Sequence, residues 1–264
     1  MRWIEARWAG ATLVGGLILA TSVSMPQQPA NPAPRPPAST PLPSSSTIPA
    51  VPAAAQPVVQ PRFVVVIDAA HGGADAGATI AEHVLEKDVT LSLAVRLRSI
   101  LAARGVTVVT VREADTNVTT LDRAGIANHS VAAACLSLHA TTSGSGVHLF
   151  NSSLSQMGNQ ANQTPGRFLP WQSAQSGYIT QSLRLASDIN SALGHAAIPV
   201  ILARTSIQPL DSFACPAVAV EIAPLPATSS GSGSALTDAA YQRRVIDAMA
   251  AALQQWQEDW RQQP

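Results

Sequence analysis

The stretch Val64–Gly73 reads VVVIDAAHGG, and it predicts a buried strand that ends at a functional site. Its first four residues are β-branched and continuous, as expected of a strand that is covered on both faces. Asp68 and His71 follow where this strand emerges, and ligands of open α/β sheets bind at the carboxyl ends of strands. Gly72 and Gly73 then allow the backbone to turn tightly beside the histidine.

Strands and helices alternate along the chain that follows. β-Branched runs predict strands, and apolar residues at helical spacing predict amphipathic helices. The expected strands are residues 64–67, 106–111, 132–139, 147–150, 199–203 and 217–222, and the expected helices are residues 89–103, 119–130, 178–193 and 236–260. This alternation predicts an α/β domain with a single sheet of about six strands, mostly parallel or mixed, and helices on both faces.

Composition and charge limit the partners of this chain. Its 264 residues include 16 basic and 16 acidic side chains, so nothing indicates a nucleic-acid partner or a polybasic membrane surface. Its two cysteines, Cys135 and Cys215, exclude a disulfide-stapled small domain and a cysteine-rich metal site. Two interpretations of these cysteines stay open, namely a disulfide formed in an oxidising compartment or two buried free thiols.

The N-terminal part of the chain predicts export. Arg2 and Arg7 precede a mildly apolar run at residues 9–23, which fits a signal-peptide core better than a membrane span of about 20 residues. We therefore expect residues 1–25 to be a signal peptide or an uncleaved membrane anchor, and the protein to reach the periplasm or cell envelope. Residues 26–61 are rich in proline and predict a disordered linker before a folded domain at 62–264.

Four residues at the ends or inside of predicted elements suit a hydrolytic metal centre. His71 follows the first strand, Glu86 lies at the mouth of the first long helix, His139 ends the third strand and Glu221 lies inside the last strand. Two imidazoles and one carboxylate are the usual ligands of a hydrolytic zinc ion, which keeps a fourth position for water. A second glutamate that does not bind the metal can then take a proton from that water.

Each of these residues also has a structural interpretation. His71 suits a turn and His139 suits a core position, while Glu86 would be a favourable acid at a helix N-terminus. Glu221 is the hardest to explain in this way, because an ionised carboxylate inside an apolar strand is costly without a partner.

Several motifs, in the same order along the chain, resemble those of the zinc-dependent N-acetylmuramoyl-L-alanine amidases, the Amidase_3 class of cell-wall hydrolases. They are DAAHGG at 68–73, EKD at 86–88, LDR at 121–123 with AN at 127–128, SLHA at 137–140 and PAVAVEI at 216–222. The chain departs from the family pattern at Ala69-Ala70, which replace Pro-Gly, at Thr141, which replaces Asn, and at Ala223-Pro224, which replace Gly-Phe.

The resemblance implies a zinc-dependent enzyme that cleaves peptidoglycan at the amide between N-acetylmuramic acid and L-alanine. It implies that Zn²⁺ is bound by His71, Glu86 and His139 and that the catalytic base is Glu221. An alternative is a weak or inactive amidase-like domain that binds cell-wall peptides or regulates another hydrolase. A third possibility is a zinc peptidase or amidase that acts on a different amide. Two further possible partners are an activator protein and a membrane, to which the N-terminal segment would attach the protein.

Several other residues receive secondary roles. Asp68 either orients His71 without binding the metal itself or is a turn residue. Arg112 and Arg123 either bind substrate carboxylates or form salt bridges. Residues 151–177 predict a long loop that acts as a lid, forms a docking site or has no function of its own. The histidines expected at the surface or in packing positions are His129, His148 and His195.

Overall fold

The computed structural model describes residues 62–156, 170–227 and 233–262 of the chain. The predicted signal or anchor segment, the Pro-rich linker and the middle of the 151–177 loop lie outside the described residues. Within those three ranges, no helix combines the length and the apolar character that crossing a membrane requires.

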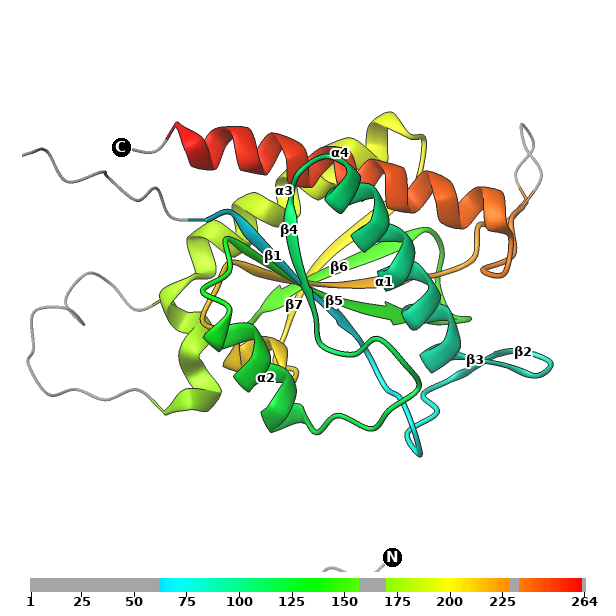
Figure 1. Ribbon diagram of the computed structural model, residues 1–264. Coiled ribbons are helices and arrows are strands. Elements are labelled where there is room, and N and C mark those ends of the chain that lie inside the picture. The colour runs from blue at the N-terminus through cyan, green and yellow to red at the C-terminus, as the bar shows by residue number, and fades with distance from the viewer. Residues whose placement is uncertain (1–61, 157–169, 228–232, 263–264) are drawn as a thin grey trace, which may run out of the picture. The chain divides into compact units, whose positions relative to one another are not determined.

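A six-stranded sheet forms the centre of the domain, with the strand order β4-β1-β5-β8-β6-β7 (Figure 1). Its strands are β1 (Val64–Ala69), β4 (Thr107–Thr110), β5 (Ala134–Ala140), β6 (Val147–Ser152), β7 (Val200–Thr205) and β8 (Ala217–Ile222). Strands β4, β1, β5 and β8 run parallel, whereas β6 pairs antiparallel with β8 and parallel with β7. The sheet is therefore mixed, which confirms the predicted α/β class and strand number.

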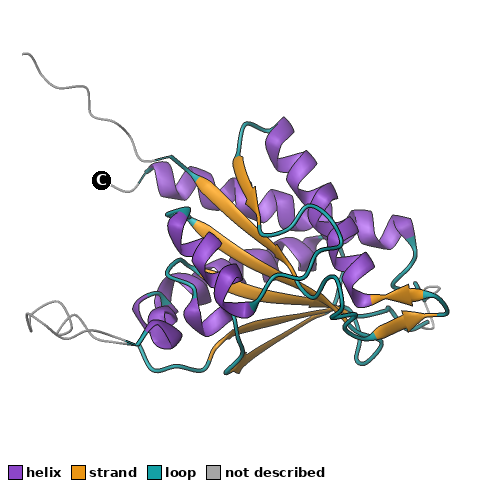
Figure 2. Cartoon of the chain, turned by 60° about the horizontal axis from the view of Figure 1, so that its bottom comes forward, coloured by secondary structure: helices purple, strands orange, loops and turns teal. Residues whose placement is uncertain are grey.

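Helices cover both faces of the sheet (Figure 2). One face packs against α1 (Glu86–Ala103), α3 (Ile179–His195) and α4 (Ala239–Arg261), and the other packs against α2 (Thr120–His129). Val65 and Ile67 of β1 belong to the first core, and Val66 belongs to the second. This division follows because successive side chains of a strand point to opposite faces.

A short hairpin replaces part of the loop that was expected between β1 and α1. It consists of β2 (Thr79–Ala81) and β3 (Val84–Leu85), which are too short to produce a periodic pattern in the sequence. The backbone N–H of Glu86 donates to the carbonyl of Ala78, 2.8 Å away, where the hairpin begins. The hairpin thus places the first residue of α1 beside the end of β1.

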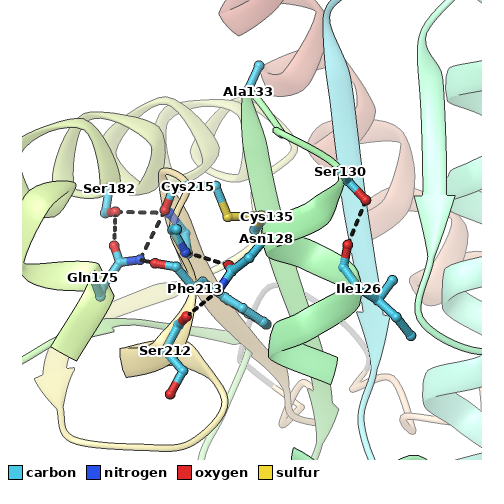
Figure 3. Close-up of a disulfide and its surroundings, with 12 residues drawn as sticks. Ile126, Asn128, Ser130, Ala133, Cys135, Gln175, Ser182, Ser212, Phe213 and Cys215 are labelled. Carbon is cyan, nitrogen blue, oxygen red and sulfur yellow. Dashed lines mark hydrogen bonds between the residues drawn. A yellow bond between two sulfur atoms is a disulfide. The ribbon is translucent and has the colours of Figure 1, made fainter. Parts of the chain in front are cut away.

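Cys135 and Cys215 form a disulfide that joins β5 to the segment before β8 (Figure 3). Both residues are fully buried in the core on the α2 side of the sheet. The side-chain amide of Gln175, in the 3-10 helix η2 (Trp171–Gly177), donates to the carbonyls of Phe213 and Cys215 in the same segment. Of the two interpretations left open by the sequence, the structure therefore shows pairing.

Removing this disulfide should destabilise the domain strongly. The bond joins residues separated by 80 positions, and a loop of that size predicts a loss of about 4 kcal/mol in the free energy of unfolding. We expect that loss for the double variant Cys135→Ala, Cys215→Ala in urea denaturation. Wild-type protein treated with a reductant is the matched control, and an unchanged denaturation midpoint in both samples would contradict the prediction.

Candidate metal centre and active site

Two histidines and a glutamate meet at the carboxyl ends of the central strands. His71 follows β1, His139 lies in β5, and Glu86 is the first residue of α1. One possible ligand atom from each residue lies within 4.8 Å of the other two. Glu86 Oε2 is 3.2 Å from Nε2 of His71, and its Oε1 is 3.1 Å from Nδ1 of His139. The structure thus brings together the three expected ligands, although His71 and His139 are 68 residues apart in the sequence.

The chemistry of this cluster suits a zinc ion. Zinc binds imidazole nitrogen and carboxylate oxygen at about 2.0–2.2 Å, so two ligand atoms on one ion lie roughly 3.3 Å apart. The Glu86–histidine separations are close to that value. Burial alone would raise the pKa of Glu86, but hydrogen bonds from His139 and from the amides of Ala78 and Ala140 lower this pKa to about 2. The carboxylate is therefore ionised at neutral pH, as a metal ligand must be.

Asp75 orients the ring of His71. Its Oδ2 lies 2.8 Å from Nδ1 of His71, so the Nδ1–H donates to the carboxylate and Nε2 is directed toward Glu86. This hydrogen bond is also the main reason why the pKa of Asp75 is lowered. The sequence suggested Asp68 for this role. No periodicity singles out Asp75, because it lies in a loop.

Replacing Asp75 with alanine should weaken zinc binding about tenfold or more, since carboxylates that orient ligand histidines contribute that much to metal affinity. A competition titration with a zinc chelator measures this change. The matched control is Asp88→Ala, which removes an exposed carboxylate from the first turn of α1. Equal zinc affinities for the two variants would show that the His71 ring does not depend on Asp75.

Asp68 and Arg123 form a buried ion pair behind the turn that carries His71. Their side chains are 1% and 7% exposed, and Arg123 Nη1 donates to Asp68 Oδ1. The other oxygen of Asp68 accepts from the hydroxyl of Ser137 at 3.0 Å. Arg123 also donates to the carbonyls of Ala69 at 2.8 Å and His71 at 2.6 Å. Asp68 therefore acts on His71 through Arg123 and the backbone, and it does not contact the imidazole ring.

Arg112 binds the same turn through further carbonyls. Its Nε donates to Ala69 at 2.9 Å, and its Nη2 donates to Ala70 at 3.0 Å and to Lys87 at 2.7 Å. Burial is the main reason why the pKa of this guanidinium is lowered. Among the described residues, the guanidinium of Arg112 binds backbone carbonyls and forms no surface ion pair. Its expected role in binding substrate carboxylates stays a prediction.

Two arginines hold the turn that carries His71. The turn needs no glycine in place of Ala70, because Ala70 does not have a positive φ. His71 has φ of 61°, a left-handed conformation that costs a residue with a side chain about 1–2 kcal/mol. Such strain persists only where the surroundings hold the backbone. The carbonyls of Ala69, Ala70 and His71 are the groups that Arg112 and Arg123 bind.

At the other two departures from the family pattern, the backbone forms hydrogen bonds between neighbouring segments around the site. The N–H of Thr141 donates to Ile222 at 2.9 Å, which continues the pairing of β5 with β8. The N–H of Ala223 donates to Gly146 at 2.8 Å, and that of Gly146 donates to Pro224 at 3.2 Å. These substitutions therefore leave the strand ends paired and remove none of the expected site residues.

Glu221 lies beside the cluster and is not part of it. On β8 it is the register partner of His139 on β5 and of His148 on β6, and partners in register carry side chains on the same face of a sheet. Its side chain is 31% exposed. Its Oε2 lies 2.7 Å from Nδ1 of His148. His148 is buried and packs against Phe150, which agrees with a packing role, but its contact with Glu221 was not predicted from the sequence.

A small polar pocket of about 100 Å³ opens at the cluster. It is lined by Asp68, Ala70, His71, Asp75, Thr120, Arg123, His139, Gln208 and Pro209. The last two residues come from the segment between β7 and the 3-10 helix η3 (Leu210–Ser212), and no sequence motif connects that segment with the site. The pocket therefore joins the carboxyl end of β1 to a segment more than 130 residues further along the chain.

Known proteins share both sequence and fold with this chain. A stretch of 55 residues is 44% identical to the germination-specific N-acetylmuramoyl-L-alanine amidase of Bacillus subtilis (strain 168), covering 21% of this chain and 23% of that protein. A stretch of 79 residues is 39% identical to the N-acetylmuramoyl-L-alanine amidase AmiA of Escherichia coli (strain K12), covering 30% and 27%. The matched segments thus span about a quarter of the length of these two relatives.

The fold is similar to that of a solved amidase domain. The catalytic domain of CwlV, an N-acetylmuramoyl-L-alanine amidase from Bacillus (Paenibacillus) polymyxa var. colistinus, matches with a TM-score of 0.56 at 23% identity. The match covers 74% of this chain and 98% of that domain. The family model described as N-acetylmuramoyl-L-alanine amidase matches residues 65–255, a range that contains the three clustered residues and Glu221. The chain therefore belongs to the Amidase_3 family of N-acetylmuramoyl-L-alanine amidases.

Proposed function

We propose that this protein is a zinc-dependent N-acetylmuramoyl-L-alanine amidase that hydrolyses the amide between N-acetylmuramic acid and L-alanine in peptidoglycan. The observation that supports this proposal most is the meeting of His71, Glu86 and His139, with Glu221 on the adjacent strand, in a member of this family. Three ligands and a separate carboxylate are the components that a hydrolytic zinc site needs.

The residues of the site then divide the work of hydrolysis. Zinc bound by the three ligands would polarise the amide carbonyl and lower the pKa of a water molecule. Glu221 takes a proton from the water molecule as the water oxygen attacks the carbonyl carbon of the lactyl group. It then gives that proton to the amine of L-alanine as the C–N bond breaks. Asp75 keeps the His71 ring oriented while Arg112 and Arg123 hold its backbone.

We also propose that the enzyme acts in the cell envelope after export. The disulfide supports this location, because such bonds persist in oxidising compartments and are rare in the cytosol. Residues 1–25 would provide the signal peptide or membrane anchor, and residues 26–61 would be the linker that separates it from the catalytic domain. A Pro-rich linker of this kind extends at about 3.1 Å per residue, which allows the domain to reach peptidoglycan at a distance from the membrane.

Two measurements on the purified protein test the proposal together. Elemental analysis should find one zinc ion per chain, and digestion of purified peptidoglycan should release stem peptides with a free L-alanine amine. A chelator should stop this release, and added zinc should restore it. A folded protein that takes up no zinc would contradict the proposed metal. A zinc-loaded protein that releases no peptides would instead favour the inactive binding domain or a different amide substrate.

A further inference from the structure

His148 contacts Glu221 directly through a part-buried hydrogen bond. The two residues are register partners on β6 and β8, and Nδ1 of His148 is 2.7 Å from Oε2 of Glu221. An ionised carboxylate only accepts hydrogen bonds, so the imidazole Nδ1–H is the donor. The His148 residue is 9% exposed, so the donor side of this hydrogen bond is shielded from solvent.

The second ring nitrogen of His148 does not compete with the contact to Glu221. Nε2 is buried and has no hydrogen-bond partner within the described part of the chain. With Nδ1 engaged by Glu221, Nε2 is the ring nitrogen that this contact leaves unpaired. A buried polar atom without a partner is unfavourable and is uncommon in native proteins. The ring therefore forgoes a hydrogen bond at Nε2 while it makes the one to Glu221.

Gly144 lets the His148 ring occupy this position. A Cβ atom added to Gly144 would lie 2.6 Å from Nε2 of His148, which is too close for any side chain at this position. The ring of Phe150 lies on another side, edge to face, with 6.4 Å between the ring centroids. The imidazole is thus confined by Gly144 and Phe150 as well as by the carboxylate it binds.

We propose that His148 is a positioning residue that holds the Glu221 carboxylate in the orientation that proton transfer requires. This inference rests on the proposed role of Glu221 as the base. The Glu221 side chain is 31% exposed, so without a partner its rotatable bonds would allow the carboxylate to turn toward solvent. The hydrogen bond engages Oε2 and leaves Oε1 as the oxygen that receives the proton. Proton transfer needs such alignment, because a base must lie within hydrogen-bond distance of the proton it takes.

Substitutions of His148 separate this role from simple packing. The amide nitrogen of asparagine can replace Nδ1, whereas that of glutamine extends to the place of Nε2. We therefore expect His148→Asn to keep most of the wild-type kcat. His148→Gln and His148→Leu should lose about 10- to 100-fold in kcat, in line with the effect of removing partners that orient functional groups. KM and zinc stoichiometry should stay within about twofold, since positioning of the base changes the transition state more than substrate binding.

The control for this series is His195→Leu, which removes an exposed histidine from the end of α3 and should leave kcat unchanged. The inference is wrong if His148→Leu keeps the wild-type kcat, or if His148→Asn loses as much kcat as His148→Leu. It is also wrong if the loss appears in KM alone.

A glycine pair tests the confinement of the ring without changing the ring itself. Gly144 and Gly105 have φ of +80° and +77°, so an alanine is strained by its backbone at both positions, but only Gly144 has a neighbour that the added Cβ would strike. We expect Gly144→Ala to lower kcat by displacing His148, and Gly105→Ala to lower the Tm without an effect on kcat. An equal kcat for the two variants would show that the space beside Gly144 does not control the position of the His148 ring.

A measurement that does not depend on turnover examines the hydrogen bond itself. Nitrogen-15 NMR of the zinc-loaded protein should show a proton on Nδ1 of His148. The His148 ring nitrogens should shift in Glu221→Ala, and His195 should not. A proton on Nε2 alone would contradict the inference even in an active enzyme. If the wild-type protein releases no stem peptides, the proposed function fails, while this spectrum still decides whether His148 binds Glu221.

Discussion

Glu221→Ala is expected to lower kcat for stem-peptide release by about 10³-fold or more while the protein still binds one zinc ion per chain. Removal of a general base that also returns the proton to the leaving amine affects both halves of the reaction, and each proton transfer contributes about 10²–10⁴-fold. The zinc content should not change, because Glu221 is not one of the three clustered residues. Steady-state kinetics on purified peptidoglycan, together with elemental analysis, measures both quantities.

Two further variants make the interpretation of this loss specific. Glu221→Gln keeps the shape of the side chain and its ability to accept from His148, but it cannot accept a proton at neutral pH, so its kcat should fall as far. Glu82→Ala removes a glutamate whose side chain is 90% exposed and should leave kcat unchanged. Activity that survives in Glu221→Gln would rule out proton transfer through this carboxylate.

Arg123→Met is expected to destabilise the folded domain by about 3–5 kcal/mol, the range for removing one partner of a buried ion pair. The variant leaves Asp68, which is 1% exposed, without its counter-charge. It also removes the Arg123 donor from the carbonyl of His71, whereas the carbonyl of Ala69 keeps its hydrogen bond from Arg112. Urea denaturation of the metal-free protein measures the loss without a contribution from zinc binding.

The surface ion pair between Arg98 and Glu113 provides the matched control. These side chains are 44% and 65% exposed, so Arg98→Met should cost less than about 1 kcal/mol. The double variant Asp68→Asn, Arg123→Met should recover part of the stability, because it removes the buried charge left by the single change. Equal losses in the free energy of unfolding for Arg123→Met and Arg98→Met would show that burial of the Asp68–Arg123 ion pair does not increase its contribution to stability.

The order of the secondary structure was predictable because it follows from local patterns. The β-branched run of β1 and the apolar stripe of α1 are visible within windows of a few residues. Those patterns located the main helices and the six strands of the sheet. The β2–β3 hairpin was not predictable in this way, because strands of three and two residues contain no measurable period.

The sequence by itself determined the α/β class, and through motif resemblance it identified the three clustered residues and Glu221. These residues are recognisable because the motifs that contain them occur in the same order along the chain as in the family. Only the tertiary structure decided that Asp75 orients His71, that Arg112 and Arg123 serve backbone carbonyls, and that His148 binds Glu221. Most of these contacts join residues far apart in the chain, 73 positions in the last case. They depend on strand register and on how the loops pack, which no local pattern encodes.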